Sequence, residues 1–158
     1  MNSSDTTTWL DDTQRHAWRT FLTMHTQLMA RLGRQLQVDS ELSMADFDVL
    51  VQLTDIADGR LRVLELAKAL QWEKSRLSHH LGRMVGRGMI VRQDCPTDRR
   101  GSFVAITPLG RAAIEAAAPR HVEAVRRFVF DSLTAEQVAA LATVSESVLR
   151  QLEQNPAA

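Results

Sequence analysis

The chain has 158 residues, of which 44% are hydrophobic and 24% are charged, and its formal net charge is zero. This length suits one domain with a single hydrophobic core, and the composition is that of an ordinary globular protein. The first eight residues are polar and no apolar run approaches the ~20 residues of a membrane span, which predicts a cytoplasmic protein with neither a signal peptide nor a membrane segment.

The neutral total hides a segregation of charge along the chain. Residues 1–59 contain four Arg and Lys against nine Asp and Glu, residues 60–101 contain ten against four, and residues 102–158 contain five against six. The three net charges are therefore −5, +6 and −1. A basic middle segment between acidic flanks predicts a surface that binds nucleic-acid phosphates.

A long amphipathic helix is predicted from residue 11 to residue 37. Its apolar side chains recur at three- and four-residue steps and form one stripe: Trp18, Phe21, Leu22, Leu28, Leu32 and Leu36. His25 falls within this stripe, where a histidine packed in or beside the core is more common than one that binds a ligand or titrates.

A second helix is predicted to begin at Ser43, because Asp46 three positions later completes a capping-box pattern. The turn signal Asp58-Gly59 marks its expected end. Residues 61–63 are then predicted to form a short strand.

Two short helical patterns follow within residues 64–85, and the polar joint at 71–74 between them is long enough only for a tight turn. This spacing predicts a helix-turn-helix, with Trp72 bracing its second helix by packing. One side of that helix carries Leu77, Leu81, Met84 and Val85, and the other carries Ser75, Arg76, His79, Gly82, Arg83 and Gly86. The basic side suits a DNA major groove, although an isolated helix of this kind is more often a solvated charged surface.

Two apolar runs, 89–91 and 103–106, flank a segment with Pro, Asp and Gly and predict a β-hairpin with a long tip. The tip carries Asp98, Arg99 and Arg100. A basic tip beside a recognition helix is typical of a DNA-binding wing, whose arginine can enter the negative minor groove. An exposed Asp–Arg pair elsewhere would contribute only about 0–1 kcal/mol, so the location on the wing carries this interpretation.

Two further helices are expected after the hairpin. Thr107 as N-cap with Pro108 at the first helical position predicts the start of one, and a kink is expected near Pro119. A capping box from Thr134 to Gln137 predicts the start of the last helix. The first helix and the last two helices carry apolar stripes. Together these stripes present more apolar surface than is needed to cover the small middle segment.

The order of these elements, the tip Asp98-Arg99-Arg100, the strand 104–106 and the helix opening Thr107-Pro108-Leu109-Gly110 resemble the MarR family of bacterial winged-helix transcription regulators. The resemblance extends from about Trp9 to Leu152. It implies a mainly α fold with a small β wing, in which a winged helix-turn-helix is combined with a helical dimerisation bundle. The implied arrangement is a single domain over residues 1–158, with a DNA-binding lobe at 43–107 and dimerisation helices at 11–37 and 108–153.

The resemblance also implies a homodimeric, sequence-specific regulator of transcription that binds a pseudo-palindromic operator in double-stranded DNA. A repressor released by a small aromatic or anionic effector is expected. The implied DNA contacts are Lys74, Ser75, Arg76, Ser78, His79, Arg83, Asp98, Arg99 and Arg100. Arg100 is expected in the minor groove, with Asp98 orienting its guanidinium and Arg99 reaching phosphate. Many relatives have arginine where this chain has His79, and a neutral imidazole donates one hydrogen bond in place of a cationic fork.

Candidates for lining an effector pocket are Trp18, His25 and Phe47, although aromatic residues at helical spacing are usually core fillers. Two alternative functions stay open: a redox-responsive regulator that uses Cys95, and a winged-helix module that binds another protein instead of DNA. An enzyme is not expected, because the sequence contains no phosphate-binding glycine loop and suggests no nucleophile with its base. The five histidines lack a metal-site spacing, so neither a metal nor a cofactor is expected.

Overall fold

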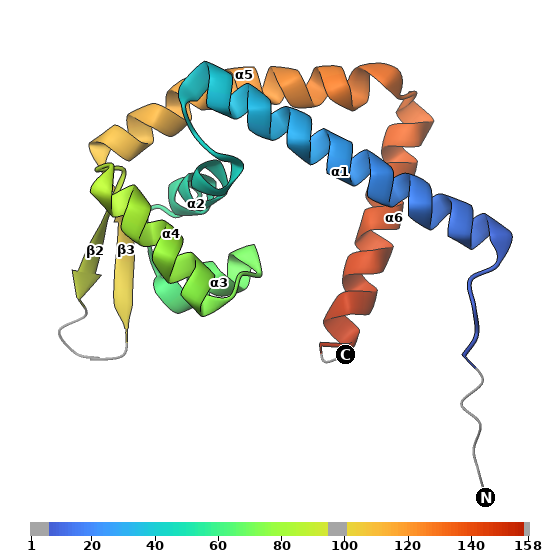
Figure 1. The fold of residues 1–158 in the computed structure, drawn as a ribbon, viewed down its shortest axis with the longest axis horizontal. Helices are drawn as coiled ribbons and strands as arrows, with labels where there is room; N and C mark the ends of the chain where they lie inside the picture. Colours follow the sequence, from blue (N-terminus) through green and yellow to red (C-terminus); the bar gives the residue numbers. More distant parts are fainter. Residues whose placement is uncertain (1–6, 95–100, 157–158) are drawn as a thin grey trace, which may run out of the picture.

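The computed structural model describes residues 7–94 and 101–156. Over these residues the chain forms mainly α-helices with one small antiparallel sheet (Figure 1). The elements in chain order are α1 (Asp12–Ser40), α2 (Met44–Thr54), β1 (Arg60–Arg62), α3 (Val63–Leu70), α4 (Lys74–Gly86), β2 (Ile90–Asp94), β3 (Ser102–Ile106), α5 (Pro108–Phe128), the 3₁₀ helix η1 (Phe130–Ser132) and α6 (Ala135–Gln154). The predicted fold class, mainly α with a β wing, is confirmed.

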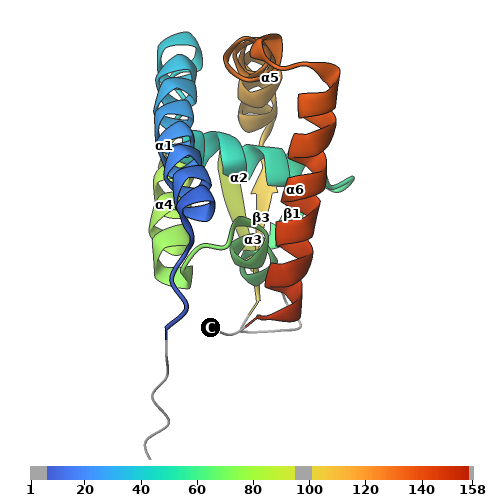
Figure 2. The same cartoon turned by 90° about the vertical axis from the view of Figure 1, so that its right-hand side faces the viewer.

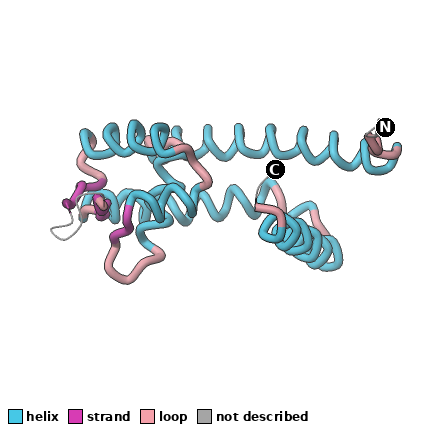
Figure 3. Tube along the Cα trace, turned by 90° about the horizontal axis from the view of Figure 1, so that it is seen from below, coloured by secondary structure: helices cyan, strands magenta, loops and turns pink. Residues whose placement is uncertain are grey.

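The molecule has the outline of an arch. Helices α1 and α5 lie side by side across its top, the lobe of α2, α3, α4 and the sheet lies below one end, and α6 descends from the other end (Figure 1). Figure 2 looks onto the end formed by α6 and the start of α1, and Figure 3, seen from below, shows α6 nearly end-on beside the two long helices. In the described part of the chain, no helix is long and apolar enough to cross a membrane.

One hydrophobic core holds the lobe together and ties it to the long helices. Buried side chains from α2, α3, α4, the sheet and the meeting point of α1 with α5 form this core: Leu36, Leu42, Val49, Leu50, Leu53, Leu66, Ala67, Leu77, Leu81, Met84, Ile90, Val104, Ile114 and Ala117. The sheet has the order β1-β3-β2 and is antiparallel throughout, with Leu61 opposite Val104 and Arg92 opposite the same residue on the other side. Burial of this continuous cluster fixes α4 against the rest of the lobe.

The helix starts that depend on local capping agree with the predictions. Ser43 accepts from the backbone N–H of Asp46 at 3.0 Å, and the Asp46 carboxylate accepts from the N–H of Ser43 at the same distance. Thr107 caps α5 with Pro108 in its first turn, and Thr134 caps α6. Each of these caps joins residues three apart, which is why the sequence predicts them.

Several boundaries differ from the predictions. Helix α1 continues to Ser40 instead of ending at residue 37, because Glu41 takes the left-handed conformation, at φ 56°, and ends the helix without a glycine. Helix α2 ends at Thr54, and Gly59 at φ 62° belongs to the turn that leads into β1. Of the four residues predicted to share the apolar side of α4, Leu77, Leu81 and Met84 are buried, and Val85 at the edge of the stripe is 38% exposed.

Helix α5 runs without interruption through Pro119 to Phe128, and the short helix η1 that follows it is not predicted by the sequence pattern. The side chain of His25 is exposed, so the expectation that it packs in or beside the core does not hold within one chain. Trp18 is likewise 52% exposed.

Candidate nucleic-acid interface

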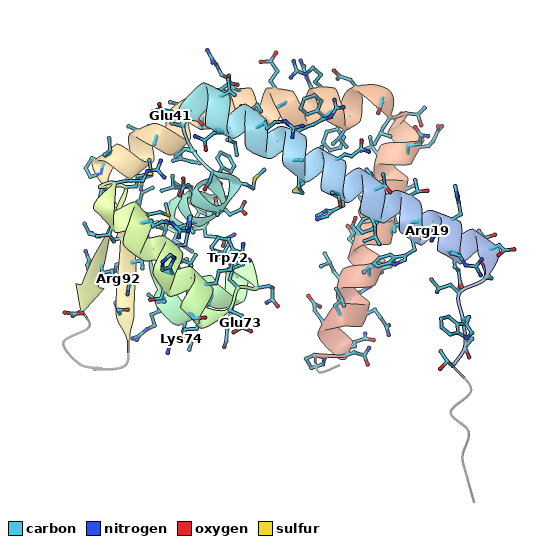
Figure 4. The ribbon with its side chains drawn as sticks, viewed as in Figure 1. Arg19, Glu41, Trp72, Glu73, Lys74 and Arg92 are labelled. Atoms are coloured by element: carbon cyan, nitrogen blue, oxygen red, sulfur yellow. The ribbon has the colours of Figure 1, made fainter. Side chains whose placement is uncertain are left out.

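The outward face of α4 is polar and basic. The predicted contact residues Lys74, Ser75, Arg76, His79 and Arg83 are all exposed, and Ser78 is half-buried. The opposite side of the helix buries Leu77, His80, Leu81 and Met84 in the lobe. Figure 4 shows Lys74 at the lower end of α4, on the side of the lobe toward which strands β2 and β3 also extend. One surface of the lobe therefore carries both the helix start and the outer ends of the two wing strands.

A buried carboxylate on α2 anchors α4. Asp46 is 2% exposed, and its Oδ2 accepts a hydrogen bond from Arg87 Nη1 at 2.6 Å. Arg87 follows the last residue of α4, and its Nη2 also donates to the carbonyl oxygen of Glu41 at 3.0 Å. Because this one guanidinium binds both the first turn of α2 and the loop residue Glu41, the C-terminal end of α4 is fixed to α2.

His80 connects the same carboxylate to the middle of α4. Its Nε2 lies 3.1 Å from Oδ1 of Asp46, but off the axis of a hydrogen bond, so the attraction between the two groups is mainly electrostatic. The ring is 7% exposed and packs edge-on against Trp72 at 5.7 Å between ring centroids. The sequence places His80 only toward the flank of the helix, whereas the structure makes it a core residue.

Burial and charge move the pKa values of this pair. Burial lowers the pKa of His80, the nearby Asp46 charge opposes this, and Arg83 and Arg76 lower it further, so that it lies below the ordinary 6.5. Burial pushes the pKa of Asp46 upward, but hydrogen bonds from Ser43 and Arg87 together with the Arg87 charge outweigh it, and the pKa lies below 3.8. At neutral pH the pair is therefore a neutral imidazole beside an ionised carboxylate.

We expect the free energy of unfolding to fall as the pH is lowered from about 7.5 to about 5.5. Below pH 6.5 the unfolded chain binds a proton at His80 that the folded chain binds only at lower pH, so acid favours the unfolded state. His121, whose pKa is also lowered by burial, contributes in the same direction. Asp46 does not contribute in this window, because it loses its charge only below its ordinary pKa of 3.8.

Urea unfolding at fixed protein concentration, repeated across this pH range, measures the slope of the free energy of unfolding against pH. The variant His80→Gln should flatten it, and His16→Gln, at an exposed position on α1, should leave it as it is. An equal slope in the wild type and His80→Gln would contradict the assignment.

The start of α4 is held by an aromatic ring in the turn. The guanidinium carbon of Arg76 lies over the Trp72 ring at 4.4 Å from its centroid, and the ring itself is half-buried. This stacking holds the Arg76 side chain over the first turn of α4. The predicted bracing role of Trp72 is confirmed, and the ring also positions one of the expected DNA contacts.

The wing is joined to α4 by one arginine. Arg92 on β2 donates from Nη2 to the carbonyl oxygen and the hydroxyl of Ser78, at 3.0 and 3.2 Å. Ser78 therefore holds the wing in place, in addition to its expected role toward DNA. The guanidiniums of Arg60 and Arg62 lie over the ring of Phe103 on β3, at 5.0 and 4.8 Å. These stacked guanidiniums add positive charge to the sheet. Neither arginine is among the DNA contacts predicted from the sequence.

Four residues named from the sequence lie outside the described part of the chain: Asp98, Arg99 and Arg100 of the wing tip, and Cys95. The described strands β2 and β3 flank this segment on both sides. Among the described residues, no group of three or more His, Cys, Asp or Glu side chains could hold a metal ion.

The three effector candidates do not share one pocket in the protomer. Trp18 and His25 both stack on Phe21 along α1, at 5.8 and 6.2 Å between ring centroids. Phe47 instead packs on His121 at 4.4 Å, where α2 meets α5. A separate cleft of about 840 Å³ lies between α1, η1 and α6, and its lining is largely apolar, with Met24, Leu28, Phe128, Leu133, Leu141 and Val144 among the lining residues.

Sequence reasoning missed the residues that position the interface, which are Asp46, His80, Arg87 and Arg92. Asp46 is recognisable from the sequence only as a helix cap. Its partner Arg87 is 41 positions away, and Arg92 and Ser78 are 14 apart. Helical periodicity carries no signal for such contacts, because they depend on how separate elements pack.

A helix-turn-helix whose second helix displays a cationic face, followed by an antiparallel hairpin, defines a winged helix-turn-helix protein. Residues 40–101 match a family model described as MarR family. The crystal structure of AbsC, a MarR family transcriptional regulator from Streptomyces coelicolor, is similar with a TM-score of 0.87 and 36% identity, over 94% of this chain and 99% of that one. The chain belongs to the MarR family of DNA-binding transcriptional regulators.

Two further relatives give the same result. Sco3205, a MarR family transcriptional regulator from Streptomyces coelicolor crystallised in complex with DNA, has a TM-score of 0.88 and 38% identity, over 94% of this chain and 93% of that one. The multiple antibiotic resistance protein MarR of Salmonella typhimurium is 29% identical over 109 residues, which are 69% of this chain and 74% of that protein.

Proposed function

We propose that the protein is a homodimer that binds a pseudo-palindromic operator by placing its two α4 helices in successive major grooves. The observation that carries this proposal is the exposed cationic face of α4, fixed to α2 through Asp46 and to the wing through Arg92. A rigid, positively charged helix face can read base edges without first paying the entropy of becoming ordered. Sco3205 and a mutant MarR from E. coli were crystallised with DNA, the latter with operator DNA, which supports the same ligand here.

Helices α1 and α6 support the homodimer. Within the described chain α6 buries no residue, although it carries a continuous apolar side. Its exposed large hydrophobic residues are Val138, Leu141, Val144, Val148, Leu149 and Leu152. The segment before α1 and the first half of that helix expose Trp9, Leu10, Trp18, Phe21, Leu22 and Met24. Apolar surface of this extent is typical of an interface, and two copies of the chain would cover each other's stripes.

The wing tip is proposed to reach the minor groove. Arg100 would insert there, Asp98 would orient its guanidinium, and Arg99 would bind phosphate. The support is the position of the two flanking strands, which extend beside α4 toward the same side of the lobe (Figure 4).

We further propose that the protein acts in the cytoplasm as a repressor and that a small aromatic or anionic effector releases it.

The effector proposal rests on Phe47 and His121, whose rings pack where the DNA-binding lobe joins the long helices. A ligand at this joint could change the angle between the lobe and the dimer helices, and with it the spacing of the two α4 helices. Trp18 and His25 lie farther along α1 and would contribute only where a second copy of the chain brings them to this joint. A thermal-shift screen of phenols and aromatic acids that finds no stabilisation would contradict this part of the proposal.

We expect Arg100→Ala to weaken binding to the DNA upstream of the protein's own gene by at least about tenfold, because the minor-groove contact is lost. Lys74→Ala should weaken all duplexes nearly alike and lower the salt slope by about one, as expected for loss of one phosphate contact. Fluorescence anisotropy over a salt series measures both effects, and circular dichroism checks the fold. Unchanged affinity of folded Arg100→Ala at moderate salt would exclude the proposed role of the wing.

A further inference from the structure

Arg83 is placed to control how its two neighbouring histidines present their ring nitrogens. Its Nη1 lies 2.7 Å from Nδ1 of His79, and its Nη2 lies 2.9 Å from Nδ1 of His80. The three residues are at i, i+1 and i+4 on α4, so one guanidinium spans both rings on the same side of the helix. His79 and Arg83 are exposed, whereas His80 is buried.

The chemistry of the donor fixes the tautomer of both rings. A guanidinium has five N–H donors and no acceptor, so each Nδ1 must offer its lone pair and carry no proton. Each neutral ring then has its proton on Nε2. For His80 this nitrogen lies 3.1 Å from the ionised Asp46, off the axis of a hydrogen bond, and the negative charge there favours the same tautomer.

His79 differs from His80 in where its Nε2–H is directed. Within residues 7–94 and 101–156, no hydrogen bond uses Nε2 of His79, and its side chain lies on the exposed face of α4. The ring nitrogen opposite the Arg83 contact is thus available to a ligand. This nitrogen, Nε2, offers a hydrogen-bond donor. The acceptor nitrogen Nδ1 is already occupied by Arg83, so the ring cannot offer an acceptor at the same place.

We propose that His79 reads a base edge through this fixed Nε2–H, and that Arg83 is a positioning residue that sets the tautomer instead of a base reader. The inference rests on the proposed function, because it assumes that α4 lies in a major groove. A lone N–H donor pairs with N7 or O6 of guanine, N7 of adenine or O4 of thymine, and it is repelled by the amino group that cytosine presents. Guanine is the preferred base, since its two acceptors are adjacent.

The link to the core explains why Arg83 can perform this role. Nδ1 of His80 lies against Arg83, and its Nε2 lies 3.1 Å from the Asp46 carboxylate, which accepts from the backbone N–H of Ser43 and from Arg87. The guanidinium that orients His79 is therefore supported from α2 through a buried ring. An exposed pair of side chains without such support would sample other rotamers and tautomers.

Selection of bound duplexes from a randomised pool tests the proposal. The wild type should enrich guanine at one position of each half-site. His79→Ala should reduce that preference by about fivefold and leave the other positions unchanged, because one hydrogen bond is lost. His79→Gln should move the preference at that position from guanine toward adenine, since the glutamine amide adds an acceptor beside its donor and pairs with N6 and N7 of adenine. Arg83→Met should weaken the preference at the same position as His79→Ala, by a smaller factor.

Two results of the selection would overturn the proposal. Loss of preference at a different position in Arg83→Met would make Arg83 a direct base reader. A uniform loss of affinity in His79→Ala, with no change in preference, would make His79 a phosphate contact. If the wild type enriches no sequence, the proposed function itself fails together with the reading role of His79.

The tautomer is measured separately, without DNA, by the nitrogen-15 shifts of the histidine rings at about pH 8. Both His79 and His80 should carry their proton on Nε2. In Arg83→Met, the nitrogen-15 chemical shift of Nδ1 of His79 should move toward the value of a ring nitrogen that accepts no hydrogen bond. A protonated Nδ1 on His79 in the wild type would contradict the inference even if the protein binds its operator.

Discussion

Leu149→Asp is expected to turn the protein into a monomer that no longer binds its operator. Leu149 is 58% exposed and belongs to the apolar side of α6, a helix of which no residue is buried within the described part of the chain. If a second copy covers this side, a carboxylate there must lose its water in both subunits. Each site should then cost about 2 kcal/mol or more, and because a symmetric dimer has two such sites, the dissociation constant should rise by about a thousandfold.

Sedimentation equilibrium measures this change directly. A matched control is Thr143→Asp, which also places one carboxylate on α6 but on the side opposite the apolar residues, where the exposed Thr143 hydroxyl donates to the carbonyl of Ala139. That variant should remain a dimer. If Leu149→Asp has the mass and affinity of the wild type, the dimer uses another surface and the proposed arrangement of the two α4 helices has no basis.

Gly110→Ala should lower the free energy of unfolding by about 3 kcal/mol. Gly110 lies in the first turn of α5, where its backbone N–H donates to the Thr107 hydroxyl at 3.0 Å. An added Cβ would overlap the carbonyl oxygen of Met89 and lie 3.0 Å from its carbonyl carbon. That carbonyl cannot easily move, because the N–H of Thr107 donates to it at 3.1 Å. The clash therefore falls where the wing, α4 and α5 meet.

The control for this prediction is Gly82→Ala. Gly82 is inside α4, and a Cβ there would meet no atom within 4 Å apart from its chain neighbours and the backbone of its own helix. Alanine should then raise the stability by about 0.5–1 kcal/mol, because it restricts the unfolded chain and favours the helix. Urea unfolding of both variants at one protein concentration makes the comparison. Similar effects of the two substitutions would show that the close approach at Met89 does not limit the packing of α5.

The fold could be predicted from the sequence wherever a local pattern determines it. The caps at Ser43, Thr107 and Thr134 each depend on a partner three residues away, and the turn between α3 and α4 is fixed by two helical patterns with a short joint. Boundaries set by the rest of the fold could not be predicted. Glu41 ends α1 in a left-handed conformation that its residue type does not favour, so no signal marks that end.

The candidate site was predictable in part for the same reason. Helical periodicity separates the exposed Lys74, Arg76 and His79 from the buried Leu77 and Leu81 without knowledge of the tertiary structure. Periodicity does not show that Asp46 on α2 lies against His80 and Arg87, nor that Arg83 donates to two rings at once. The contacts of Asp46 arise only when α2 packs against α4. The two contacts of Arg83 lie within α4 and support the proposed orientation of His79.

The central claim is that the exposed face of α4 binds the duplex, and hydroxyl-radical footprinting of the protein with mass spectrometry tests it most directly. His79 on α4 and His16 on α1 are both exposed and provide matched reporters. Addition of the operator duplex should sharply reduce oxidation of His79 and leave His16 unchanged. Equal oxidation of His79 with and without bound duplex would contradict the claim, because DNA would then lie on another surface.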